Sequence, residues 1–475
     1  MPLNPLRGIP KLLLSVPKAT RTLFSQFPLL PALLLFLFEF SELLLVSPRI
    51  RLLEASICRS HYLATNPSIV PPTGTIPEEL CKLEPIQARL AYIRGWQVFC
   101  EAIPVMVMAI PWGAIADRVG RKKVLVVNFV GCAVHILWFV LVCHPRSTFP
   151  PEAVWASGFA FIVGGGPRTG GIMILALVTD SSSKKKRSER FYYTYSAFLV
   201  TELVAPPLSA VLMSYSSLAP FSIALFSLIL CLPVLSSIPT RILPLSPHHP
   251  PSPTASPLLR PTTPPIPSEP TSPPFYHSLT RNLALLLLLH LLCPTRQELT
   301  FQILIPYTSL TFSLPIPTAG LLLSLIALSN LVSILLLLPH LSRRLTARGY
   351  TPLRIDILTA KYSCLLIAGA CILLGWTRSL AVFTTAVGVF AAGFGVRLAV
   401  LSAVTKVVGE GEIGRWLGVV TVVEGVGEMI AAVGLQRVWV VGMGVGKEVV
   451  GYGGVWWVGA VVYGIGAVVV ERVRG

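Results

Sequence analysis

Long apolar runs recur along the whole sequence and limit what the chain can fold into. A helix of about 20 apolar residues crosses the hydrocarbon core of a bilayer, which is about 30 Å thick. Runs of that length recur between residues 28 and 470. The mean hydropathy is +0.72 and 53% of residues are hydrophobic, which is more apolar surface than one soluble core can bury. The sequence therefore predicts an all-α protein that crosses a membrane many times.

Twelve such runs can be assigned as transmembrane helices. Helices are expected because a membrane span must satisfy its own backbone hydrogen bonds. The predicted spans cover residues 28–48, 95–116, 124–143, 153–179, 191–213, 218–238, 283–306, 319–338, 355–376, 380–405, 416–441 and 449–470.

A proline-rich segment divides the twelve spans into two groups of six. Residues 239–274 hold fourteen of the 42 prolines, and proline removes backbone donors and fixes φ. We therefore expect an extended linker between two pseudo-symmetric six-helix bundles. The predicted organisation is a tail at 1–27, a bundle at 28–238, a linker at 239–282, a second bundle at 283–470 and a tail at 471–475.

Lysine and arginine predict the orientation of the chain. They concentrate in the connections after spans two, four and eight, which places those connections, the linker and both termini in the cytoplasm. These residues are Arg118, Arg121, Lys122, Lys123, Lys184, Lys185, Lys186, Arg187, Arg190, Arg343, Arg344, Arg348 and Arg354. The predicted outward loop at 49–94 is an exception, since it carries six basic residues of its own.

The charge pattern and the motifs exclude several classes of protein. The net charge is +17, and the basic residues cluster between apolar runs. This placement fits loops beside anionic lipid rather than a nucleic-acid-binding surface. No His/Cys cluster has zinc spacing, so neither a metal nor a cofactor is expected. Residues 164–171, GGGPRTGG, match no phosphate-binding loop and predict tight helix packing instead. The acid-and-histidine motifs of membrane transferases are absent, so we do not expect an enzyme.

One charged cluster, GAIADRVGRKK at residues 113–123, follows the second span. It matches the pattern G-x-x-x-D-R-x-G-R-[RK] at every defined position and resembles the signature of the major facilitator superfamily. An ordinary positive-inside loop is the alternative, but that rule requires neither an acid nor glycines. The matching residues are Gly113, Asp117, Arg118, Gly120, Arg121 and Lys122.

The resemblance implies that this cluster is a conformational latch. Gly113 permits close approach of a neighbouring helix, and Gly120 permits a tight turn. Asp117 lies at the negative end of its own helix and is stabilised if it faces the start of the eleventh span, near Trp416.

The basic residues of the latch are expected to form ion pairs with acidic residues. We expect Arg121 and Lys122 to pair with Asp117 and with Asp180, at the end of the fourth span. These contacts would form and break as the two halves close and part, so Asp117→Asn is expected to slow transport without preventing insertion.

Further segments extend the resemblance over nearly the whole chain. EASICRSHY (Glu54–Tyr62), EELCK (Glu78–Lys82) and ELVAPPL (Glu202–Leu208) are similar to a group of major facilitators of filamentous fungi. That group is distantly similar to proton-coupled folate and tetracycline-type carriers. HLSRRLTARGY (His340–Tyr350) occupies the corresponding place in the second half, as an old parallel repeat would.

Ionisable residues inside predicted spans are candidate functional groups, because each costs about 2.5–3.5 kcal/mol to insert. We expect some of them to line a central cavity in which a carboxyl carries a proton and an arginine holds an anionic substrate group. Glu39 and Glu202 are the favoured proton carriers, and Pro294 should loosen the helix beside Arg296. Structural ion pairs between helices are the alternative. The candidates are Glu39, Glu42, Glu101, Arg168, Glu202, Arg296 and Arg397.

Two cysteines share the first predicted outward loop. Cys58 and Cys81 are 23 residues apart. An oxidising exterior would permit a bridge between them, and two free thiols are the alternative.

The sequence thus predicts a secondary transporter that moves a small organic solute by alternating access with proton coupling. The alternatives are an efflux antiporter of the same fold and a receptor that does not transport. Residues 205–210, APPLSA, lack the glycines that drug–proton antiporters of the family carry in span five, which leaves the direction open. The expected partners are the solute, protons and the bilayer, without nucleic acid, around a monomer in a plasma or vacuolar membrane.

Overall fold

The computed structural model describes residues 30–144 apart from 73 and 75, then 148–181, 187–238, 280–408, 413–445 and 449–473. The predicted N-terminal tail at 1–27 and nearly all of the predicted linker, 239–279, lie outside the described residues. The described chain is almost entirely helical.

Six helical spans form the N-terminal half. The first contains a two-residue break at Leu44 and Leu45, and the fourth begins as a 3₁₀ segment. The elements are α2 (Leu30–Leu43), α3 (Val46–Thr65), α4 (Glu84–Val119), α5 (Arg121–Cys143), η4 (Pro151–Ile162), α6 (Gly166–Ser181), α7 (Arg187–Tyr215) and α8 (Ala219–Ser237).

The C-terminal half repeats this arrangement with more interruptions. The elements are α9 (Arg281–Leu292), α10 (Pro294–Glu298), a π-helical turn η6 (Leu299–Ile303), α11 (Leu304–Phe312), α12 (Ile316–Val332), a second π-helical turn η7 (Ser333–Leu337), α13 (Leu338–Ala347), α14 (Pro352–Trp376), α15 (Leu380–Ala392), α16 (Gly395–Val407), α17 (Ile413–Val445) and α18 (Val449–Glu471).

Eleven helical runs in the described part of the chain are long and apolar enough to cross a membrane. The predicted seventh span is not among them, and Cys293 and a π-helical turn divide it into α9, α10 and α11. Every predicted span nevertheless coincides with a helical run in the expected order. The all-α membrane fold with two six-span bundles is therefore confirmed.

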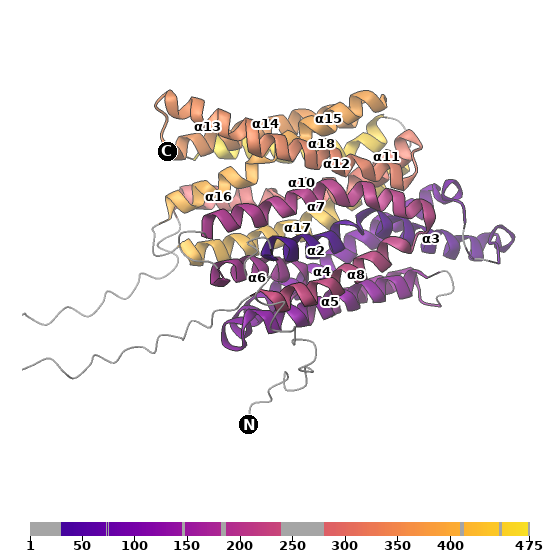
Figure 1. Ribbon diagram of the computed structural model, residues 1–475. Coiled ribbons are helices and arrows are strands. Elements are labelled where there is room, and N and C mark those ends of the chain that lie inside the picture. The colour runs from indigo at the N-terminus through magenta and orange to yellow at the C-terminus, as the bar shows by residue number, and fades with distance from the viewer. Residues whose placement is uncertain are drawn as a thin grey trace, which may run out of the picture.

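The two halves pack alike and meet along two helix pairs (Figure 1). In the N-terminal half, α2 packs on α7 and α8, and in the C-terminal half, α9 packs on α17 and α18. Between the halves, α4 packs on α17, and α7 packs on α12. A twofold exchange of the halves turns the first of these pairs into the second, which fits the predicted duplication.

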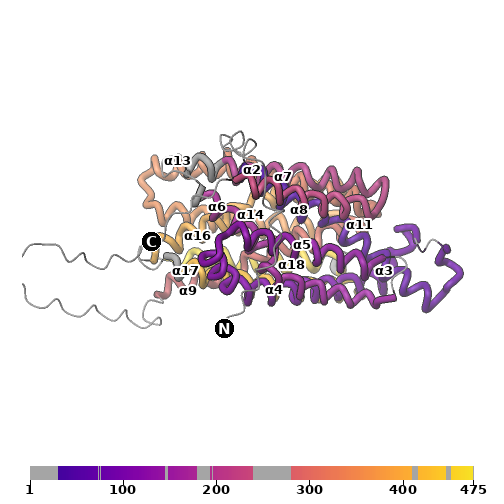
Figure 2. The backbone as a smooth tube through the Cα atoms, turned by 60° about the horizontal axis from the view of Figure 1, so that its bottom comes forward, coloured from indigo at the N-terminus to yellow at the C-terminus, as the bar shows by residue number. Residues whose placement is uncertain are grey.

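The prediction of a long outward loop at 49–94 is wrong. Helix α3 continues to Thr65 and α4 begins at Glu84, so only residues 66–83 connect them. Figures 1 and 2 show α3 projecting beyond the other helices at this end of the molecule. The apolar-run criterion detects only the part of a helix that lies in hydrocarbon, and these extensions are polar.

Four of the six basic residues of this region have acidic partners, which explains why a predicted outward segment can carry them. Arg49 lies 3.1 Å from Glu42, and the Nη2 atom of Arg89 lies 2.7 Å from Glu152. Arg51 and Lys82 pair with the same carboxylate of α3, at 3.0 and 2.8 Å. Their charge is therefore neutralised locally.

The glycine-rich stretch of span four packs closely against α5. Gly164 and Gly166 have positive φ, and their carbonyls accept hydrogen bonds of 2.8 Å from the Nδ2 atom of Asn128. A Cβ atom added at Gly164 would lie 2.3 Å from the Cα atom of Asn128. The glycines thus serve the expected helix packing.

Candidate substrate cavity

A cavity of about 360 Å³ lies between the two halves, near the middle of the spans. Helices α2, α6 and α7 line it from the N-terminal half, and the broken seventh span, α12 and α16 line it from the other half. Its polar wall includes Glu39, Glu202, Arg296, Gln297, Thr300, Asn330 and Arg397, and its apolar wall includes Leu35, Phe198, Phe301 and Phe394.

A hydrogen-bonded chain crosses the cavity wall from one half to the other. The Nδ2 atom of Asn330 on α12 donates to Glu202 on α7 at 3.4 Å. The Oδ1 atom of Asn330 accepts from the Nη2 atom of Arg296 at 2.9 Å. The two predicted groups, Glu202 and Arg296, are therefore linked through an amide, while Glu39 lines the same cavity from α2.

The break in span seven positions Arg296. Helix α9 ends at Leu292, two residues before Pro294, which cannot donate a backbone hydrogen bond. The hydroxyl of Tyr463 donates to the carbonyl of Cys293 at 3.1 Å and accepts from the backbone N–H of Arg296 at 3.0 Å. A side chain of α18 thus satisfies backbone groups at the break.

Aromatic rings of span ten hold the guanidinium of Arg296. Its central carbon lies 5.4 Å from the ring centre of Phe390 and 5.3 Å from that of Phe394. Such cation–π contacts stabilise a cation away from bulk water. The Nη2 atom also donates to the carbonyl of Ala391 at 3.1 Å. Arg296 is therefore oriented by both α12 and α15–α16.

Arg397 lines the cavity, but its guanidinium is already paired with a carboxylate. Its Nε and Nη2 atoms lie 3.0 and 2.7 Å from the two carboxylate oxygens of Glu424 on α17. The Nδ1 atom of His290 lies 3.0 Å from the same carboxylate. This bidentate pair fits the ion-pair alternative better than a free anion-binding group.

Three predicted residues do not line the cavity. Arg168 forms an ion pair with Glu428 of α17, across the boundary between the halves. Glu42 pairs with Arg49 at 3.1 Å. Glu101 accepts hydrogen bonds from Gln97 at 2.8 Å and Ser157 at 3.3 Å. Arg168 therefore does not share the cavity of Glu202 and Arg296 in this conformation.

Sequence reasoning missed two residues of this region. Asn330 bridges the two charged groups, but counting ionisable residues alone passes over an amide. Glu298 on α10 is 3% exposed, and its Oε2 atom has no hydrogen-bond partner among the described residues. It lies two positions after Arg296, within the proline-broken segment that already marked span seven.

The signature loop makes contacts within its own half. Arg121 lies 3.8 Å from Asp117 and donates to the carbonyl of Ala176 on α6 at 2.8 Å. Lys122 donates to the carbonyls of Ser236 and Ile238 at the end of α8. The loop thus joins four helices, α4, α5, α6 and α8, at the predicted cytoplasmic end of the N-terminal half.

The two glycines of the signature differ in role. Gly120 has φ +99°, a conformation that favours glycine at the turn between α4 and α5. A Cβ atom added at Gly113 would meet no described atom within 4 Å, so the expected close helix approach is absent in this conformation. The side chain of Asp180 lies outside the described part of the chain, and its pairing stays a prediction.

The predicted cysteine pair lies between α3 and the short connection to α4. The Cα atoms of Cys58 and Cys81 are 5.3 Å apart and their sulfurs are bonded. This separation is common for disulfides. The bridge would fasten the projecting helix to the connection that follows it.

Comparisons with known proteins agree with this architecture. The chain is 34% identical over 174 residues to the MFS efflux pump atnC of Emericella nidulans, which covers 37% of this chain and 34% of that protein. It is 34% identical over 184 residues to the efflux pump ustT of Aspergillus flavus, covering 38% and 34%. The chain therefore matches about a third of the length of these relatives.

Solved structures share the fold at low sequence identity. A D-xylose–proton symporter has a TM-score of 0.61 at 14% identity and covers 93% of this chain and 97% of its own. The human organic anion transporter MFSD10 has a TM-score of 0.56 at 18% identity, covering 96% and 100%. The family model for the Major Facilitator Superfamily matches residues 93–432. The chain therefore belongs to the Major Facilitator Superfamily, as a membrane protein of many spans.

Proposed function

We propose that the protein is a secondary transporter that moves a small organic solute by alternating access. The observation that carries this proposal is the chain from Glu202 through Asn330 to Arg296, which borders a cavity between the halves. A solute bound there contacts both halves at once. Its binding energy can therefore favour one relative arrangement of the halves over another.

The cavity wall favours an amphipathic solute with an anionic or strongly polar group. Phe198, Phe301 and Phe394 offer apolar surface, while Arg296 offers a cation held by its neighbours. A guanidinium recognises carboxylate or phosphate oxygens in a planar geometry. The remainder of the solute would lie against the aromatic side chains.

Proton coupling is the second part of the proposal. Glu39 and Glu202 both border the cavity, so each carboxyl can exchange a proton with the space that the solute occupies. Glu202 is linked to Arg296 through Asn330. When Glu202 gains a proton it loses its negative charge, which weakens its hydrogen bond with Asn330 and changes the charge that the cavity presents to the solute.

Efflux by exchange with protons is a second candidate, because two relatives are named efflux pumps. A receptor that senses a solute without moving it is a third. The three differ in what the solute does to protons. Symport carries protons with the solute, antiport carries them against it, and a receptor carries none.

The test uses purified protein in vesicles that contain a pH-sensitive dye. A panel of organic anions, sugars and amphipathic cations is added outside, one at a time. Acidification of the interior indicates symport and alkalinisation indicates antiport, whichever way the protein is inserted. Absence of both proton movement and solute counterflow across the panel would contradict the proposed function.

Matched variants locate the coupling group. Glu202→Gln should reduce solute-dependent proton movement at least tenfold, because the amide keeps the hydrogen bond to Asn330 but carries no proton. Glu79→Gln, at an exposed position of the outer connection, should leave it unchanged. Equal proton movement in both variants would remove Glu202 from this role.

A further inference from the structure

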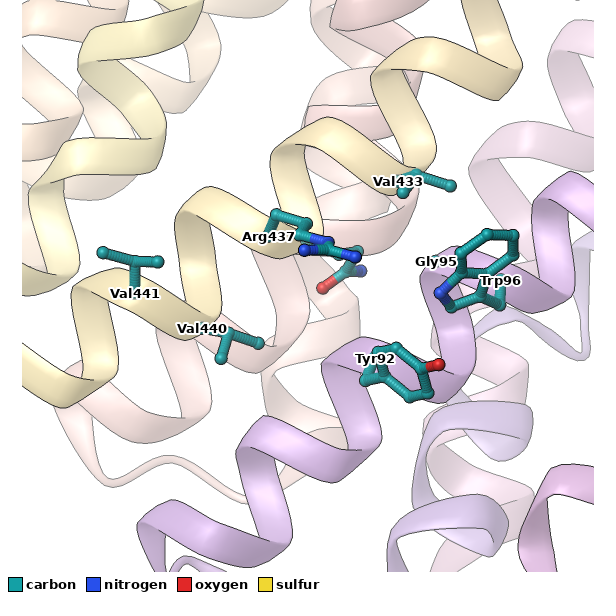
Figure 3. A pocket seen from close by; sticks show the side chains of 8 residues that line it. Tyr92, Gly95, Trp96, Val433, Arg437, Val440 and Val441 are labelled. Atoms are coloured by element: carbon teal, nitrogen blue, oxygen red, sulfur yellow. The ribbon is translucent and has the colours of Figure 1, made fainter.

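A second hollow of about 300 Å³ lies on the outside of the molecule, between α4 and α17. These helices belong to different halves and cross closely, since a Cβ atom added at Gly95 would lie 3.1 Å from that of Gln436. Figure 3 shows Arg437 extending from α17 toward α4, with the rings of Tyr92 and Trp96 facing the same space.

Three hydrogen-bond donors around this groove have no acceptor among the described residues. Gln436 is 3% exposed, and its buried Nε2 atom has no partner. The buried Nε1 atom of Trp96 also has none. The exposed side chain of Arg437 forms no ion pair or hydrogen bond with the described part of the chain. Buried donors are almost always satisfied, so the two buried donors of Gln436 and Trp96, beside the exposed Arg437, point to a ligand that accepts hydrogen bonds.

The surroundings of the groove are those of lipid rather than water. Tyr92 is 47% exposed, although its ring also contacts Trp155 of η4 at 6.1 Å between ring centres, and Val441 is 68% exposed. Arg437 lies eight residues before the end of α17 at Val445, a distance of about 12 Å along a helix. Tyr92 lies eight residues after the start of α4, so both side chains have a similar depth near the predicted outward surface.

Aromatic residues and arginines at such a depth occupy the boundary between acyl chains and headgroups. A single arginine facing hydrocarbon without a counter-charge is costly. An anionic hydrogen-bond acceptor would remove the cost of this unpaired arginine. Such an acceptor has to lie at this depth and to come from the bilayer. Among membrane components, the phosphate of a phospholipid has all three properties.

We propose that this groove binds one phospholipid of the outward leaflet. The phosphate pairs with Arg437 and accepts hydrogen bonds from Gln436 and Trp96, while an acyl chain lies along Val433, Val440 and Val441. Because α4 and α17 move relative to each other when the halves rock, lipid bound across them favours one arrangement. The site is separate from the substrate cavity, so lipid binding stands without the proposed function, and only its effect on the arrangement of the halves rests on that function.

The test measures lipid at this place directly. Purified full-length protein in maltoside micelles is titrated with phosphatidylcholine that carries a diazirine in one acyl chain, irradiated and digested. Cross-links to peptides containing residues 92–96 or 433–441 are counted against lipid concentration. Arg437→Gln should raise the half-saturating concentration about tenfold, because a charged hydrogen-bond partner is lost. Arg437→Lys should restore most of the binding.

Controls separate the lipid from other ligands and from misfolding. Arg348→Gln, an exposed arginine at the opposite end, should bind as the unchanged protein does. Diazirine-labelled diacylglycerol, which lacks phosphate, should show no difference between Arg437 and its glutamine variant. Equal half-saturation in Arg437→Gln and the unchanged protein would overturn the proposal. Competition by millimolar inorganic phosphate would overturn it as well, because the site would then hold a free anion.

Discussion

A single buried carboxylate organises the predicted outward end of the N-terminal half. Glu54 on α3 is fully buried, and its oxygens lie 2.8 Å from the Nζ atom of Lys82 and 2.6 Å from the Nε2 atom of Gln87. Arg51 donates to it at 3.0 Å. One acid thus fastens the extension of the first span to the connection and to the start of α4.

Glu54→Gln should lower the stability of the protein by about 3 kcal/mol, because it removes the buried carboxylate and leaves Arg51 and Lys82 with Glu78 as their acidic partner, at 3.4 and 2.8 Å. Thermal unfolding of the purified protein, followed by tryptophan fluorescence, measures the change. Glu79→Gln, one exposed acid on the same connection, is the matched control and should unfold as the unchanged protein does. Equal unfolding temperatures for the two variants would contradict this role for Glu54.

The identity of the cavity residues was partly predictable at this scale. Insertion cost selected Glu39, Glu202, Arg296 and Arg397, and all four line the cavity. The same criterion selected Arg168, which pairs with Glu428 instead. When a span is apolar on every side, its sequence does not show how the helix is rotated about its own axis. Sequence therefore identifies a charged residue in a span but not the surface that it faces.

Close backbone contact between helices is decided at the scale of elements. Helices α14 and α18 cross where Gly375 and Gly453 meet, since a Cβ atom added at Gly453 would lie 2.2 Å from the carbonyl oxygen of Gly375. The neighbouring Gly454 has no described atom within 4 Å of such a Cβ. Two adjacent glycines of one helix thus have opposite surroundings.

Gly453→Ala should destabilise the protein by roughly 1–3 kcal/mol, because the methyl group forces the two helices apart. Gly454→Ala should be neutral or stabilising, since alanine favours the helix by up to about 1 kcal/mol over glycine. The unfolding temperatures of the two variants in detergent decide the matter. A larger loss for Gly454→Ala would show that α14 and α18 do not cross at this point.

The order of the spans followed from the sequence, whereas their ends did not. The apolar runs marked each span because the bilayer requires them. The part of α3 beyond Ser47 and the start of α4 are polar. The ion pair between Arg51 and Glu54, three residues apart, stabilises one turn of α3. Side-chain pairs of this kind depend on tertiary partners such as Lys82, which hydropathy does not register.

At the scale of the whole molecule, the two halves are joined at the predicted outward end. Arg94 on α4 donates to the carbonyls of Gln302 and Phe301 at 2.8 and 3.0 Å. The Oε1 atom of Glu78 accepts from the backbone N–H of Ile316 at 2.9 Å. These contacts connect different halves, so a transporter that opens outward has to separate them.

A cross-link at this end tests whether the separation is required. A Cβ atom added at Gly320 on α12 would lie 3.3 Å from that of Ser47 on α3, close enough for a disulfide. Oxidation of the variant with Ser47→Cys and Gly320→Cys should abolish solute-dependent proton movement, and reduction should restore it. The single variants and the unchanged protein, treated with the same oxidant and reductant, account for effects on Cys58 and Cys81. Full activity with the cross-link formed would mean that the outward ends stay together during the cycle, and alternating access through the cavity would then be untenable.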